Sequence, residues 1–106
     1  MTHDKEIAYI SGAISSDPHY REKFANAQMV LESLGYYVIS PTMIPPILTY
    51  DEHMNIDIPM VLAADTLCLF ADWKESGGAP VERDLAMKNG KRIIYYKGVD
   101  TEPPRW

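Results

Sequence analysis

Short, mostly apolar segments recur along the chain and alternate with longer amphipathic ones. Four of them have the length and composition of β-strands, namely EIAYISG, YYVIS, DTLCLFA and KRIIYY. Apolar character throughout a segment, instead of strict alternation, is typical of parallel strands covered on both faces. The pattern therefore predicts four buried strands in this order.

The segment between the first two strands has a helical pattern. Asp17-Pro18 predicts the start of the helix, with proline in the first helical position, and Gly35 predicts its end. The apolar residues between them recur at helical spacing, and they are Phe24, Ala27, Val30, Leu31 and Leu34.

A second helix is expected from Tyr50 or Asp51 to Ala64. Its apolar side would be formed by Met54, Ile58, Val61 and Leu62. Pro59 lies inside this pattern and should kink or delay the helix, because proline has no N–H to donate.

The segment VERDLAMKNG predicts a third helix, closed by Asn89-Gly90. The remaining segments are rich in proline, glycine and polar residues, and we expect them to be irregular. They are PTMIPPILTY, DWKESGGAP and the tail KGVDTEPPRW.

Strands that alternate with helices predict a single α/β domain over residues 1–106, Rossmann-like with a flavodoxin-like arrangement. We expect a parallel sheet of four to five strands with helices on both faces. Ligands of such sheets bind beyond the carboxyl ends of the strands. The loops SGAISSD, SPTMIPP and ADWKESGGAP follow strands and should meet at this edge.

Composition narrows the range of partners. The hydrophobic fraction of 46% is normal for a globular protein. The net charge of −5 argues against nucleic acid or an anionic membrane as the main partner, since both require clustered Lys and Arg. A small anionic ligand stays possible, because a few backbone N–H groups can hold one phosphate.

Cys68 is the single cysteine, and its apolar neighbours predict a buried thiol in a reducing compartment. The start MTHDKEIAYI lacks the features of a signal peptide, and no apolar run reaches membrane-spanning length. We therefore expect a cytoplasmic protein without a membrane partner. The three histidines show no metal-ligand spacing, so neither a metal nor an organic cofactor is implied.

The stretch SGGAPVERDLA places glycines and a hydroxyl ahead of a carboxylate at a helix start. A helix N-terminus preceded by glycines binds anions, and a carboxylate there stays ionised. An ordinary helix cap is the other interpretation of Glu82. The capping box is imperfect, however, because the expected N-cap three residues earlier is Ala79, with Pro80 as the first helical residue.

Tyr9, Asp57 and Glu82 each have an ordinary interpretation, as a core aromatic, a surface carboxylate and a cap. Asp65 and Ser76 are also expected to be turn or cap residues when considered alone. Together, however, the first three can meet at one sheet edge. Two carboxylates beside an apolar pocket suit hydrolysis or transfer at an anomeric carbon, where the transition state resembles an oxocarbenium ion.

Four stretches resemble the nucleoside 2-deoxyribosyltransferase superfamily, in the family's order across residues 8–96. They are YISGAI, YREKFANAQMVLESLGYYVISP, MNIDIPMVLAADTLCLF and SGGAPVERDLAMKNGKRIIY. The chain is most similar to the short, often phage-encoded members and to the 2'-deoxynucleoside 5'-phosphate N-hydrolases. The resemblance implies a homodimer or larger assembly, because sites in this family are often completed across a subunit interface.

The resemblance also implies roles for the three candidate catalytic residues. Glu82 would attack or stabilise the anomeric carbon, Tyr9 would orient Glu82, and Asp57 would protonate or hold the departing base. Relatives acting on free nucleosides usually have an aspartate where this chain has Ser76, whereas the monophosphate hydrolases have a serine. A carboxylate would repel a phosphate and a hydroxyl would bind it, so a nucleoside 5'-monophosphate is the expected substrate.

The candidate substrate-binding residues come from the loops at the carboxyl ends of the strands. They are Ser11, Gly12, Ala13, Ile14, Ser76, Gly78 and Ala79, with Met43, Ile44, Ile47 and Trp73 as expected walls around the base. The chain departs from the family at Ala13, where the monophosphate hydrolases have a phosphate-binding serine, and at Pro59, close after Asp57. It also lacks the longer C-terminal segment with which some relatives complete a neighbour's site.

The leading hypothesis is an N-glycosidase that cleaves the base–sugar bond of nucleoside 5'-monophosphates, in the 2'-deoxy form. Three alternatives stay open on the sequence. They are a 2-deoxyribosyltransferase acting on free nucleosides, a non-catalytic nucleotide-binding module of the same fold, and an interaction domain whose apolar loop meets a protein partner. The base, and ribose versus deoxyribose, are not determined.

Overall fold

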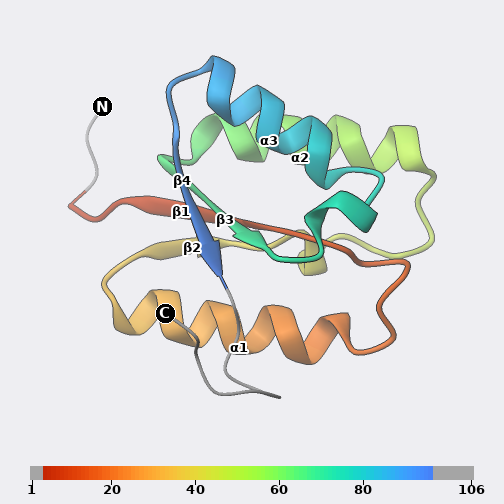
Figure 1. Cartoon of the computed structure of the whole chain (residues 1–106), viewed down its shortest axis with the longest axis horizontal. Helices are drawn as coiled ribbons and strands as arrows, with labels where there is room; N and C mark the ends of the chain where they lie inside the picture. Colours follow the sequence, from red (N-terminus) through yellow and green to blue (C-terminus); the bar gives the residue numbers. More distant parts are fainter. Residues whose placement is uncertain (1–3, 97–106) are drawn as a thin grey trace.

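The computed structural model describes residues 4–96, which form one α/β domain (Figure 1). The elements are β1 (Ile7–Ser11), α1 (Tyr20–Ser33), β2 (Tyr37–Ile39), α2 (Tyr50–Ala63), β3 (Thr66–Phe70), α3 (Ala79–Lys88) and β4 (Arg92–Tyr96), with short 3-10 helices η1 (Pro41–Met43) and η2 (Trp73–Glu75). The expected irregular tail, 97–106, lies outside the described residues.

The four strands form one parallel sheet in the order β2-β1-β3-β4. Helix α1 covers one face of the sheet, and α2 and α3 cover the other, as Figure 1 shows. The expected fold class is confirmed, with four strands in the described part of the chain.

Alternation along β1 divides the core into two layers, because successive side chains of a strand point to opposite faces. Ala8 and Ile10 pack on the α1 side, in one cluster with Phe24 and Phe70. Tyr9 packs on the other side with residues of α2 and α3. Ser11, two residues after Tyr9, therefore lies on the α2–α3 face as well.

Helix α2 begins with a capping box and continues through an internal proline. Thr49 accepts a hydrogen bond from the Glu52 N–H, and the Glu52 side chain accepts from the Thr49 N–H. Of the two effects expected from Pro59, the delay was wrong, since the helix starts at Tyr50, and the kink stays a prediction. The carbonyl that loses its helical donor belongs to Asn55, an exposed residue whose carbonyl water can satisfy.

The predicted start of the first helix was also wrong. Helix α1 begins at Tyr20, two residues after Pro18. The Asp17 carboxylate accepts the His19 N–H at 2.9 Å, and the Asp17 carbonyl accepts the Tyr20 N–H at 3.2 Å. The aspartate thus forms a turn that competes with the first helical hydrogen bonds.

Two further boundaries differ from expectation. The segment PTMIPPILTY is not wholly irregular, because Ser40 caps a single 3-10 turn at its start. The N-cap of α3 is Gly78, so Ala79 and not Pro80 is its first residue. The helix ends were predicted correctly, since Gly35 and Gly90 have positive φ angles of 99° and 68° after α1 and α3.

The amino-terminal edge of the sheet is held by polar contacts. The Ile7 N–H donates to the Asp65 carboxylate at 2.8 Å, and Thr66 Oγ1 donates to Glu6 at 3.1 Å. Arg92 pairs with the same glutamate at 3.4 Å. The expected structural role of Asp65 is confirmed, and it lies at the edge opposite the loops SGAISSD and ADWKESGGAP.

Candidate active site

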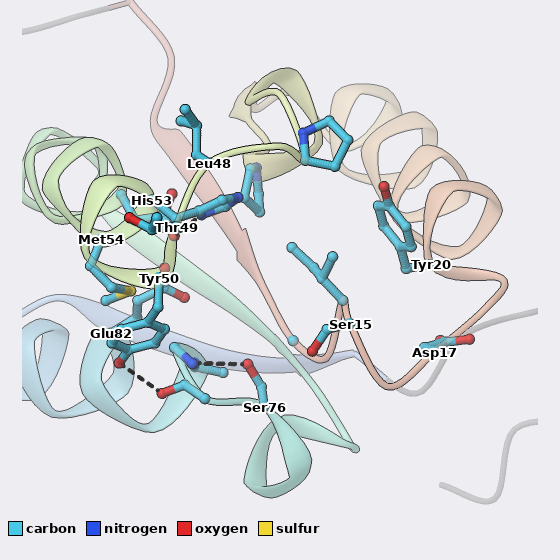
Figure 2. Close-up of a pocket in the computed structure, with 18 of the residues that line it drawn as sticks. Ser15, Asp17, Tyr20, Leu48, Thr49, Tyr50, His53, Met54, Ser76 and Glu82 are labelled. Carbon is cyan, nitrogen blue, oxygen red and sulfur yellow. Dashed lines mark hydrogen bonds and ion pairs between the residues drawn. The ribbon is translucent and has the colours of Figure 1, made fainter.

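A cavity of about 510 Å³ lies at the carboxyl edge of the sheet, where the loops after β1, β2 and β3 meet (Figure 2). Its volume lies in the range of small-molecule sites. The loop after β1 contributes Gly12, Ile14 and Ser15, and the loop after β3 contributes the stretch 76–79. The predicted meeting of these loops at one edge is confirmed.

Glu82 lies at the buried end of this cavity, in the first turn of α3. Only 4% of the residue is exposed. Tyr9 Oη donates to Glu82 Oε2 at 2.7 Å, and Ser11 Oγ donates to Oε1 at 2.6 Å. Both carboxylate oxygens are therefore fixed by hydroxyls from the same face of β1, as the two-residue spacing requires.

Burial shifts the pKa values of Tyr9 and Glu82. It raises the pKa of Glu82 to about 8, and the charge of Asp57 adds to the shift while the two hydroxyls oppose it. Burial and then the charge of Glu82 raise the pKa of Tyr9 well above its usual value. Tyr9 therefore stays a neutral donor to Glu82.

Asp57 projects from α2 and is buried, with 4% of the residue exposed. His53 Nδ1 lies 3.1 Å from Asp57 Oδ2, one helical turn away. The other oxygen, Oδ1, is buried and has no hydrogen-bond partner among the described residues. The helix thus presents a carboxyl with one fixed and one unengaged oxygen beside Glu82.

The loop before α3 is organised by Ser76. Its Oγ accepts the N–H groups of Gly78 at 3.2 Å and Ala79 at 3.1 Å. A Cβ at Gly78 would lie 3.1 Å from the Met54 sulfur, so the loop packs closely on α2. The N–H groups expected to bind a ligand therefore already have a side-chain partner within the loop.

The turn after β1 is held by contacts with Phe70 and Asp72. A Cβ at Gly12 would lie 2.4 Å from the Phe70 ring, so no larger residue fits there without movement. The Ala13 N–H donates to Asp72 at 3.1 Å, and Lys23 joins Asp72 to Asp17. Gly12 lines the cavity, whereas Ala13 is buried beside it.

The four residues that were expected to form walls around the base do not line the cavity. Met43 and Ile47 are 64% and 88% exposed, and Ile44 is buried outside the cavity lining. Trp73 packs against the α2–α3 side of the core and stacks on Arg83. The apolar lining instead includes Tyr20, Pro41, Pro46 and Leu48, because η1 turns the loop after β2 by one 3-10 turn.

Sequence reasoning did not single out several residues of the site, among them His53, Tyr50 and Asp72. His53 could have been found from its spacing of four residues before Asp57 on a predicted helix. Tyr50 lines the cavity and donates to the Gly77 carbonyl at 3.1 Å, and Asp72 holds Ala13. Those two contacts join separate elements, and no sequence spacing signals them.

Cys68 is fully buried, as expected, and burial raises its pKa to about 12. Its thiol is therefore un-ionised at neutral pH. Within residues 4–96, no three His, Cys, Asp or Glu side chains gather as they would around a metal ion. The helices of the same region include none long and apolar enough to cross a membrane.

The chain belongs to the family described as Domain of unknown function (DUF4406), which matches residues 6–95. No curated protein matches the sequence. Among solved structures, the chain is similar to the 2-desoxiribosyltransferase from Leishmania mexicana, with a TM-score of 0.68 and 20% sequence identity. The match covers 86% of this chain and 63% of the other, so this chain spans less than two thirds of that enzyme's length. The expected deoxyribosyltransferase-like fold is confirmed.

Proposed function

We propose that the protein cleaves the base–sugar bond of nucleoside 5'-monophosphates, in the 2'-deoxy form, with Glu82 as the attacking carboxylate. One observation carries the proposal. A buried glutamate with both oxygens fixed by hydroxyls faces a cavity beside a second buried carboxyl. Most glycosidases use such a pair of carboxyls for substitution at an anomeric carbon.

The raised pKa of Glu82 supports a division of labour between the carboxyls. Because that pKa is about 8, the site holds one proton at neutral pH. Glycosidic cleavage requires one ionised and one protonated carboxyl. The hydroxyls of Tyr9 and Ser11 stabilise the charge on Glu82, and Asp57 Oδ1 is free to carry the proton.

In the first step, a Glu82 oxygen bonds to C1', and the C1'–N bond breaks with its electron pair going to the base. The proton of Asp57 passes to the departing base. In the second step, water attacks C1', its proton returns to Asp57, and the bond to Glu82 breaks. Atoms and protons balance over the cycle, and the products are free base and sugar 5-phosphate.

The segment Ser76 to Ala79 supports a phosphate at the 5' position of the sugar. It lines the cavity at the N-terminus of α3, where the helix dipole favours an anion. Binding there requires the phosphate to displace the Ser76 hydroxyl from the N–H groups of Gly78 and Ala79, with that hydroxyl then donating to the phosphate.

Transfer of deoxyribose between free nucleosides is the second candidate. The cavity lining contains the carboxyls of Asp17, Asp57 and Glu82 and, in the described chain, no Lys or Arg. This lining favours an uncharged substrate, and the enzyme of similar fold is named a 2-desoxiribosyltransferase.

The test is a chromatographic assay for free base, using nucleoside 5'-monophosphates and the matching nucleosides in ribo and deoxyribo forms. We expect wild type to release base from deoxynucleoside monophosphates, and Glu82→Gln to be inactive. Glu75→Gln, at an exposed residue of η2, is the matched control and should behave as wild type.

Other outcomes discriminate between the alternatives. Base release from nucleosides alone, or exchange only when a second base is added, would favour the transferase. Nucleotide binding without any release would favour a binding module, and neither binding nor release would favour a protein-interaction domain. A homodimer, implied by the resemblance, stays a prediction that light scattering of the purified protein can check.

A further inference from the structure

His53 and Asp57 form a contact within the cavity that the proposed reaction does not yet use. They lie four residues apart on α2, so their side chains stack on one face of the helix. The His53 side chain is 22% exposed and the Asp57 side chain 5%, with Nδ1 and Oδ2 3.1 Å apart. Both residues line the cavity, and Figure 2 shows His53 on α2.

The two oxygens of Asp57 have different surroundings. Oδ2 contacts the imidazole, while Oδ1 is buried with no hydrogen-bond partner among the described residues. A buried polar atom without a partner is unfavourable and calls for an explanation, of which a catalytic role is one. A carboxyl that accepts a hydrogen bond at one oxygen keeps its proton on the other oxygen.

Groups from the neighbouring elements do not replace this contact. Glu82 of α3 and Tyr9 of β1 are the titratable groups beside Asp57, which raises the pKa values of both, and Tyr9 donates its hydroxyl to Glu82. Among the described residues that line the cavity, His53 is the basic one. The contact between His53 and Asp57 can therefore determine which Asp57 oxygen carries the proton.

We propose that His53 is a positioning residue for Asp57: it donates from Nδ1 to Oδ2, so that the acidic proton resides on Oδ1 and points toward the departing base. The inference rests on the proposed function. The imidazole keeps its own proton throughout the cycle, because Asp57 loses one proton to the base and regains one from water. His53 thus acts through the orientation of Asp57 and not by proton transfer.

Kinetics of base release provide one test. We expect His53→Ala to lower kcat about tenfold to a hundredfold, which is part of what general acid catalysis supplies, with KM changed less than about twofold. His53→Asn places an amide N–H near the position of Nδ1 and should restore most of kcat. His19→Ala, at an exposed histidine outside the cavity lining, is the control.

The identity of the leaving base separates positioning from a general structural effect. An N7-methylated purine departs without needing a proton, so His53→Ala should lose little rate on such nucleotides. In the Asp57→Asn background, the same substitution should add no further loss. Equal losses on both substrate types, a loss expressed in KM alone, or no loss at all would overturn the proposal.

Nitrogen-15 NMR of the imidazole tests the contact without any activity. We expect the Nδ1 position of His53 to be protonated at neutral pH and its resonance to shift in Asp57→Asn. An unprotonated Nδ1, or no response to Asp57→Asn, would overturn the inference. If wild type released no base, the proposed function would fall, while this spectrum would still decide whether His53 donates to Asp57.

Discussion

A pair of carboxylates lies at each edge of the sheet, and the two pairs differ in exposure and in hydrogen-bond partners. At the amino edge, Glu6 and Asp65 are exposed and bonded to backbone N–H, hydroxyl and guanidinium groups. At the carboxyl edge, Asp57 and Glu82 are buried, with hydroxyls and one imidazole as their partners.

The two environments have opposite effects on stability. The exposed pair has donors that stabilise its charge, so it contributes to the fold at neutral pH. Burial raises the pKa of Glu82 to about 8, and Asp57 Oδ1 has no hydrogen-bond partner among the described residues, so both features are unfavourable for folding. Perturbed carboxyls in a cavity are candidates for a functional site, which is the basis of the proposal above.

The largest expected effect is on the rate. Asp57→Asn should lower kcat for base release about 10²–10⁴-fold, because an amide cannot deliver the proton that a general acid supplies. Asp65→Asn, at the opposite edge, keeps an oxygen that accepts the Ile7 N–H and should stay within about twofold of wild type. Steady-state assays of both variants measure the contrast. Similar losses in the two variants would show that the edges do not differ in function.

The next effect is on the pH dependence of stability. The pKa of Glu82 is about 8 when folded and 4.5 ordinarily, so between these values the folded state binds the extra proton. The unfolding free energy should therefore fall as pH rises from about 4.5 to 8, by at most about 1.4 kcal/mol per pH unit from this group.

Glu82→Gln removes this titration and should be more stable than wild type at about pH 8, by roughly 2–4 kcal/mol. The gain should vanish near pH 4.5. Urea unfolding at several pH values measures the difference, with Glu75→Gln as the exposed control. Curves for wild type and Glu82→Gln that run parallel with pH would contradict the raised pKa.

A smaller effect is expected at the amino edge. Asp65→Ala removes the acceptor of the Ile7 N–H and should lower the unfolding free energy by about 1 kcal/mol, since water can replace part of the bond at this exposed site. The rate of base release should not change. Urea unfolding measures the loss, and a reduced kcat in the folded variant would argue against separate roles for the two edges.

The smallest effect is expected for the ion pair between Arg92 and Glu6. Its side chains are 59% and 46% exposed, and such surface pairs contribute little. Arg92→Gln should change the unfolding free energy by less than about 0.5 kcal/mol in the same assay. A loss of unfolding free energy several times larger would mean that this exposed ion pair contributes substantially to stability.

The fold was predictable from sequence because its signals are local. Four apolar segments gave the strands, and the positive φ angles of Gly35 and Gly90 match the two predicted helix ends. The helix starts were less accurate. The turn formed by Asp17 and the N-cap at Gly78 depend on side-chain and loop geometry that spacing does not contain.

The candidate site was predictable in its centre and not in its walls. Tyr9 and Glu82 come together because parallel strands bring their carboxyl ends to one edge. The apolar wall depends on the direction in which a proline-rich loop turns, and η1 carries Met43 outward while Pro41, Pro46 and Leu48 line the cavity. A hydrophobic residue in a loop shows only that it is apolar, not which way it faces.

The Ser76 hydroxyl, which accepts two N–H groups at the start of α3, makes recognition there an exchange reaction. The N–H groups of Gly78 and Ala79 already have this partner, so an incoming group that binds them gains only the difference between its bonds and those of the serine. A neutral sugar hydroxyl would form hydrogen bonds similar to those of the Ser76 hydroxyl, so its binding would gain almost no free energy. A doubly charged group would gain from the helix dipole as well, and that gain would shrink as salt is added. Selectivity at this position would thus be a matter of charge and ionic strength.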